Sequence, residues 1–112
     1  MHVRRVLVPA LVALVVVAGC GSASTPAPTS GSASVVIQNY QYTPQVLNVT
    51  VGTTVTWTNR DPVPHTVTAD NGAFSSGNLS QGATFSFTFT KPGTYEYYCE
   101  IHTFMHGTIV VH

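Results

Sequence analysis

Residues Ala83 to Thr90 read ATFSFTFT, and this stretch decides the class of fold. Apolar and hydroxyl-bearing side chains alternate along it without interruption. In an extended chain, the alanine and the three phenylalanines therefore point to one side, and the threonines and the serine point to the other. The stretch predicts a β-strand with one buried face and one solvated face.

The same alternation recurs along the chain between short groups of turn residues. It covers Leu47–Val51, Val55–Trp57 and Tyr95–Cys99, and it places Cys99 on an inward face. Turns such as Asn71-Gly72 and Lys91-Pro92-Gly93 separate these runs, and no helical pattern lies between them. Seven to eight short strands at this spacing predict an all-β fold, a Greek-key antiparallel β-sandwich.

The start of the chain differs in character from the rest. Met1–Arg5 is a short basic segment, and Val6–Ala18 is an apolar run of about 13 residues, too short to cross a hydrocarbon layer of about 30 Å. We interpret residues 1–19 as a signal peptide. Its end, Val17-Ala18-Gly19-Cys20, is similar to the bacterial lipobox, so Cys20 is the expected site of lipidation. The alternative is an ordinary secretory signal with an incidental cysteine.

Residues 20–34 contain the expected lipidated Cys20 and a linker rich in Ser, Ala, Pro, Thr and Gly. The folded domain is expected at 35–112, close to the lower size limit for a single core, so a bound metal would add to its stability. We expect it outside the cytoplasm, held to the bacterial membrane by lipid. The pair Arg4-Arg5 leaves both Sec and twin-arginine export open.

Charged side chains are scarce after the signal peptide. Two are cationic and four are acidic, which gives a net side-chain charge of −2 with histidines neutral; they are Arg60, Lys91, Asp61, Asp70, Glu96 and Glu100. There is no basic patch for phosphate contacts, which excludes nucleic acid as an expected partner.

Most of the candidate metal-binding side chains lie in residues 97–107, which read YYCEIHTFMHG. Cys99 ends one predicted strand, and His102 and Met105 come before the next, so the three residues lie at a loop that can turn three side chains toward one point. His65, in RDPVPHTVTAD, follows a proline-punctuated turn and is expected to open a strand at the same edge of the sandwich. One thiolate, two imidazoles and one thioether form the ligand set of a blue-copper site.

Two segments resemble the cupredoxins, the type 1 blue copper proteins, and among them the amicyanin- and plastocyanin-like members. They are TWTNRDPVPHTV around His65 and FSFTFTKPGTYEYYCEIHTFMHGTIVV around the other three candidates. The resemblance covers about residues 34–112. It implies that His65, Cys99, His102 and Met105 bind one copper ion that alternates between Cu(I) and Cu(II). It also implies a monomeric electron carrier with transient redox protein partners and no catalytic residues.

Two positions in the ligand loops depart from the family pattern. Thr66 stands where cupredoxins usually carry an Asn that ties the two ligand loops together, and we expect the Thr66 hydroxyl to make this bond. Ile101 and Thr103 stand where amicyanins have prolines around the second histidine. Ile101 thus returns a backbone N–H to the loop, and we expect this N–H to point at the Cys99 sulfur.

Other functions use some of the same features. Copper capture or delivery needs the same four ligands and an exchangeable metal. A zinc enzyme needs two imidazoles, a thiolate and an open fourth position, and Met105 argues against it. In a plain binding module, Cys99 would be a buried structural thiol. His106 and His112 are expected to be ordinary surface residues, and a multicopper oxidase is excluded because too few histidines are present.

Overall fold

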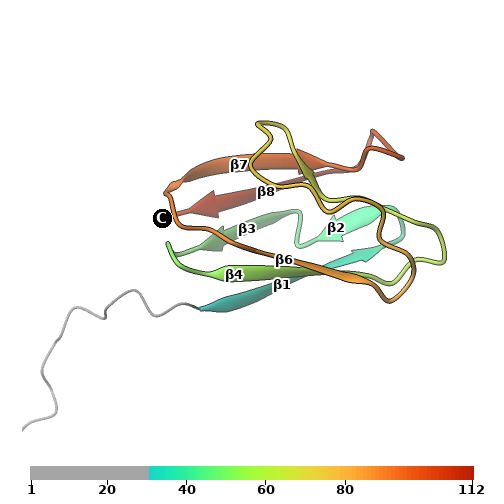
Figure 1. Cartoon of the computed structure of the whole chain (residues 1–112), viewed down its shortest axis with the longest axis horizontal. Coiled ribbons are helices and arrows are strands. Elements are labelled where there is room, and N and C mark those ends of the chain that lie inside the picture. Colours follow the sequence, from blue (N-terminus) through green and yellow to red (C-terminus); the bar gives the residue numbers. More distant parts are fainter. Residues whose placement is uncertain (1–30) are drawn as a thin grey trace, which may run out of the picture.

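The computed structural model describes residues 31–112, so the predicted signal peptide, Cys20 and most of the predicted linker lie outside the described residues. The described chain forms two four-stranded sheets that pack face to face (Figure 1). The all-β sandwich of seven to eight strands is confirmed. The strands are β1 (Ser32–Gln38), β2 (Gln41–Thr43), β3 (Val46–Val49), β4 (Thr54–Asn59), β5 (Thr68–Ala69), β6 (Thr84–Thr88), β7 (Gly93–Tyr98) and β8 (His106–Val111). β1 therefore begins inside the segment that the sequence assigned to the linker.

The strand order is β2-β1-β4-β6 in one sheet and β3-β8-β7-β5 in the other. Most neighbouring pairs are antiparallel, as expected, but β1 pairs with β4 and β3 pairs with β8 in parallel. Both parallel pairs arise because the chain changes sheets after β2, which ends before Pro44, a residue with no N–H to donate to a sheet. The chain leaves the first sheet there after β2 and continues as β3 in the second sheet. β4 then returns alongside β1 in the same direction.

The alternating side chains fill the space between the two sheets. Trp57 of β4 lies at the centre and is fully buried, with the rings of Phe74, Phe85, Phe89 and Tyr97 at centroid distances of 5.7, 5.7, 6.5 and 5.5 Å. The hydroxyls of ATFSFTFT lie on the outer face, where Thr54 pairs with Thr88 and Thr56 pairs with Ser86 at 2.7 Å. The predicted inward and outward faces of this strand are therefore confirmed.

Three connections meet at one end of the sandwich, on the right in Figure 1. They are the β1–β2 turn, the segment after β4 and the loop between β7 and β8, because β1, β4 and β7 all run toward that end. The start of β1 and the C-terminus lie at the opposite end (Figure 1). Nothing in residues 31–112 forms a helix long and apolar enough to span a bilayer.

Candidate metal centre

Three of the predicted ligands meet at the end of the sandwich where these connections converge. The Cys99 Sγ lies 3.8 Å from the Nδ1 of His65 and 3.8 Å from the Nδ1 of His102, and the two Nδ1 atoms are 3.1 Å apart. His65 and Cys99 are fully buried, and His102 is half-buried. Among the described residues, His65, Cys99 and His102 form the group of side chains whose donor atoms lie close enough together to hold a metal ion.

The distances fit one metal ion inside the triangle of donor atoms. Bonds of about 2.1 Å to nitrogen and about 2.3 Å to sulfur put these ligands about 3.8 Å apart when the angle at the metal is trigonal. The separations of Cys99 Sγ from both imidazoles have this value. A thiolate and two imidazoles in a trigonal plane match copper of the blue type, for which a methionine is the usual weak axial donor. The cofactor that fits this donor set is one copper ion.

The loop after β7 is closed by its own backbone. The Met105 N–H donates to the His102 carbonyl at 2.9 Å, and the Cys99 N–H donates to the Met105 carbonyl at 3.2 Å. These bonds bend residues 99–105 into a compact turn, so His102 and Met105 come back beside Cys99. Met105 is buried, with 2% of its surface exposed. The loop thus brings together the three residues that the C-x-x-H-x-x-M spacing selected.

His65 reaches the site from the segment after β4. The side-chain amide of Asn59, the last residue of β4, donates to the carbonyls of Val63 and Leu79 at 2.9 and 2.8 Å and so shapes this segment. His65 then exchanges two backbone hydrogen bonds with Leu79. The expectation that His65 opens a strand is wrong in detail: it forms an isolated bridge, and β5 begins only at Thr68.

Two backbone N–H groups donate to the Cys99 sulfur, those of Thr66 and His102, each at 3.4 Å. The donor expected from the sequence, Ile101, is not one of them. The physical reason is the turn after Cys99, in which the N–H three residues later points back at the cysteine side chain. The sulfur is therefore held from both ligand segments.

Thr66 makes the connection that the sequence assigned to it. Its hydroxyl oxygen accepts a hydrogen bond of 2.8 Å from the Glu100 N–H and lies 3.1 Å from the Thr68 hydroxyl. Its carbonyl accepts from the hydroxyl of Tyr42, whose pKa burial raises strongly, so this phenol stays a neutral donor. The segment that carries His65 and the loop that carries Cys99 are thus tied together by a buried threonine.

One acidic residue at the site was not found from the sequence. Asp61 is 5% exposed, and its Oδ2 lies 2.8 Å from the Nε2 of His65. Burial alone would raise the pKa of Asp61. Hydrogen bonds from the N–H groups of Tyr40 and Asn39 and from His65 outweigh burial and hold this pKa below its ordinary value. The only sequence signal was a carboxylate four residues before the histidine, in a turn rich in proline.

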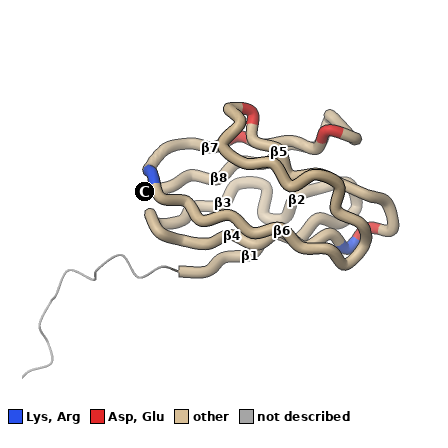
Figure 2. The backbone as a smooth tube through the Cα atoms, viewed as in Figure 1, with Lys and Arg blue, Asp and Glu red and all other residues tan. Residues whose placement is uncertain are grey.

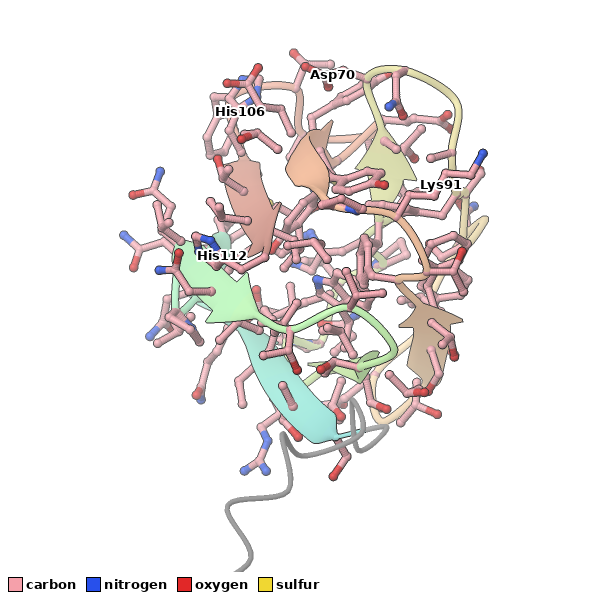
Figure 3. All side chains as sticks on the ribbon, turned by 90° about the vertical axis from the view of Figure 1, so that its left-hand side faces the viewer. Asp70, Lys91, His106 and His112 are labelled. Carbon is pink, nitrogen blue, oxygen red and sulfur yellow. The ribbon has the colours of Figure 1, made fainter. Side chains whose placement is uncertain are left out.

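Exposed apolar side chains lie beside the half-buried His102 and form a rim. The ring of Tyr40 stands edge-on to His102 at 4.9 Å and to His65 at 5.4 Å between centroids. Phe104 and Ile101 are 69% and 43% exposed beside it. His106 and His112 are exposed, as predicted, and Figure 3 shows them well apart from each other.

Residues 10–111 match the family model of the cupredoxin-like domain, and the chain belongs to this family. It is 38% identical to an amicyanin of Paracoccus denitrificans over 72% of this chain and 66% of that protein, and 35% identical to amicyanin-alpha of Methylorubrum extorquens over 73% of each. The chain thus spans about two thirds of the length of the first of these relatives. A purple cupredoxin from Nitrosopumilus maritimus has a similar structure, with a TM-score of 0.67 and 38% identity over 71% of this chain and 99% of that one. The resemblance read from the two ligand segments is confirmed.

Proposed function

We propose that the chain is a type 1 blue copper protein that carries single electrons between redox partners outside the cytoplasmic membrane. In this proposal His65, Cys99, His102 and Met105 would hold one copper ion, with the thiolate and the two imidazoles as the strong donors and the Met105 thioether as a weak one. The observation that carries the proposal is the triangle of Cys99 Sγ and the two Nδ1 atoms, whose sides of 3.8, 3.8 and 3.1 Å fit one ion.

Bound copper would take up one electron as Cu(II) and release it as Cu(I). The protein's part is to keep the ligands in place through both states. The ligand segments are joined to each other by Thr66, and the sulfur accepts two backbone hydrogen bonds. A site held in this way changes little in geometry on electron transfer. Cys99 carries much of the electronic coupling, and the half-buried His102 is the exit toward a partner.

The burial of the site supports a carrier rather than an enzyme. His65, Cys99 and Met105 are all at most 2% exposed, so a substrate would have little access to a metal ion past these three side chains. A catalytic zinc site needs an open position for substrate. Copper delivery would use the same four residues but needs a metal that exchanges readily, and the same burial favours retention. Loss of copper to a competing chelator within minutes would favour delivery.

The surface around His102 fits transient contact with a redox protein. Tyr40, Ile101 and Phe104 present exposed apolar surface there. Charged positions are few over the whole described chain (Figure 2), and the exposed Arg60 and Glu100, which lie in the two segments that carry His65 and Cys99, have opposite signs. Such a surface supports small, short-lived encounters. We propose that the protein acts as a monomer in these encounters.

We also propose that residues 1–19 are a signal peptide and that lipid on Cys20 anchors the protein to the outer side of the cytoplasmic membrane. β1 starts at the end of the sandwich opposite the metal centre (Figure 1). An anchor that precedes β1 would therefore leave His102 facing away from the membrane. Mass spectrometry of the mature N-terminus tests this: a diacylated Cys20 is expected, and an unmodified N-terminus would contradict the anchor.

The test of the copper proposal is reconstitution of the purified protein with Cu(II). We expect an intense blue thiolate-to-copper absorption that ascorbate bleaches. Cys99→Ser should abolish the colour because the thiolate donates the charge-transfer electron, whereas His112→Ala, at an exposed histidine outside the site, should retain it. A blue spectrum that survives Cys99→Ser would contradict the assignment.

A further inference from the structure

A buried carboxylate contacts the fully buried imidazole at the metal centre. The two oxygens of Asp61 accept three hydrogen bonds: Oδ1 from the Asn39 N–H at 2.8 Å, and Oδ2 from the Tyr40 N–H at 3.0 Å and the His65 ring at 2.8 Å. Because both ends of the carboxylate are held, the side chain has a single defined position. Of the acidic side chains in residues 31–112, Asp61 is the one that contacts a candidate copper ligand.

This contact determines which nitrogen of the His65 ring carries the proton and which faces the metal centre. Its Nδ1 faces the Cys99 sulfur, and its Nε2 faces the carboxylate. The proton of the neutral ring therefore lies on Nε2, and the lone pair on Nδ1 is free for a metal. His102 differs: it is half-buried, and no protein atom among the described residues is hydrogen-bonded to its Nε2. The two imidazoles are thus held in different ways.

The same carboxylate also holds the turn between β1 and β2. Asn39 and Tyr40 have φ values of 54° and 58°, as both central residues of a two-residue type I′ turn require, and Tyr40 adopts this left-handed conformation with a bulky side chain. A role limited to this turn would make Asp61 a purely structural residue. The experiment must therefore separate stabilisation of the turn from an effect on the metal.

Resting on the copper site proposed above, we propose that Asp61 is a positioning residue that fixes the Nδ1 of His65 toward copper and favours Cu(II) over Cu(I). A carboxylate that accepts a hydrogen bond from the Nε2–H makes the ring a stronger donor to the metal, and its negative charge favours the more highly charged ion. The step affected is the uptake of one electron by Cu(II). Asp61 accordingly lowers the reduction potential and slows the loss of copper.

The first test compares Asp61→Asn with Asp70→Asn in the copper-loaded protein by voltammetry. Both changes remove one negative charge, but Asp70 is exposed and has no contact with the ligands, so its variant measures the effect of losing an acidic group that does not touch the site. We expect a higher potential in Asp61→Asn and a potential close to that of the wild type in Asp70→Asn. Asp61→Ala should also lose copper to an external chelator about tenfold faster, the size typical of a lost contact of this kind. Equal potentials in the two asparagine variants would overturn the proposal.

A second measurement does not depend on how well the variants fold. In the wild-type protein loaded with Zn(II), which has no redox chemistry, nuclear magnetic resonance should detect a slowly exchanging Nε2 proton on His65 and a rapidly exchanging one on His102. Equal exchange of the two protons would overturn the proposal. Failure of the wild type to form a blue site would instead overturn the proposed copper function, so the two failures are distinguishable.

Discussion

The hydroxyl oxygen of Thr66 accepts a hydrogen bond of 2.8 Å from the backbone N–H of Glu100. Thr66 follows His65 and Glu100 follows Cys99, so this bond joins the neighbours of two candidate ligands that come from different parts of the chain. It is the link that cupredoxins usually make with an asparagine. A shorter side chain performs it here, and the Thr66 side chain is fully buried.

Replacing Thr66 by valine should therefore destabilise the protein. The two side chains have nearly the same shape, but valine leaves the partly buried Glu100 N–H without its acceptor. An unsatisfied donor of this kind costs about 1–3 kcal/mol. Denaturant unfolding of the metal-free protein measures the change, and Thr66→Ser, which keeps the hydroxyl, is the control. Equal stability of the valine and serine variants would mean that the bond contributes nothing.

Met105 provides a test of the axial position. Met105→Leu replaces a thioether by a hydrocarbon of similar volume, which a buried site tolerates at a cost below about 1.5 kcal/mol. Because the donor proposed for Met105 is a weak one, the copper site should stay blue while its potential rises, since loss of a donor disfavours Cu(II). Visible spectroscopy and voltammetry of the two proteins measure both effects. Complete loss of copper binding would assign Met105 a stronger role.

The sandwich and three of the site residues were predictable because both depend on local pattern. Alternation fixes the inward face of ATFSFTFT and of the strand that ends near Cys99, and the spacing of Cys99, His102 and Met105 within one loop reports their proximity. His65 was found through its chemistry and the resemblance. The parallel pairs β1/β4 and β3/β8 were not predicted, because a change of sheet at Pro44 leaves no periodic signal.

The contacts around the ligands were predicted only in part. The role of Thr66 followed from the family pattern. The sulfur donor was assigned to Ile101, whereas the turn orients the N–H of His102 instead, and such a detail depends on backbone angles that composition does not report. Asp61 was missed because the two N–H groups that hold its carboxylate beside His65, those of Asn39 and Tyr40, lie more than 20 residues earlier in the sequence. Long-range contacts of this kind require the folded structure.

Electron transfer to a protein partner should depend little on ionic strength. The rim around His102 is formed by Tyr40, Ile101 and Phe104, so the encounter rests on apolar contact rather than on charge. At physiological ionic strength, exposed charges farther apart than about 8 Å are largely screened. Because the contact surface is apolar, this screening should change the rate of the encounter little. Stopped-flow rates between 50 and 500 mM salt provide the measurement. A steep fall in rate would show that charge steers the encounter, and Phe104→Ala should lower the rate at every salt concentration.

The last prediction concerns the strand pair that leads into the metal centre. Gly107 of β8 lies opposite Tyr97 of β7, and a Cβ at Gly107 would clash with the ring and hydroxyl of Tyr97. Tyr97 is fully buried against Tyr42 and Trp57 and has no room to move away. Gly107→Ala should therefore destabilise the protein by about 1–3 kcal/mol, the usual range for overpacking.

A rescue variant isolates the cause of that loss. The Tyr97 hydroxyl is buried and has no hydrogen-bond partner of good geometry among residues 31–112, so Tyr97→Phe alone should cost little. Because this hydroxyl is one of the atoms that the new methyl group would meet, Tyr97→Phe should restore part of the stability lost in Gly107→Ala. Denaturant unfolding of the four proteins forms a double-mutant cycle. Strictly additive changes in the free energy of unfolding would show that the alanine acts through the backbone. A positive coupling would show that the close packing of Tyr97 on Gly107 requires a glycine at this position, two residues after Met105.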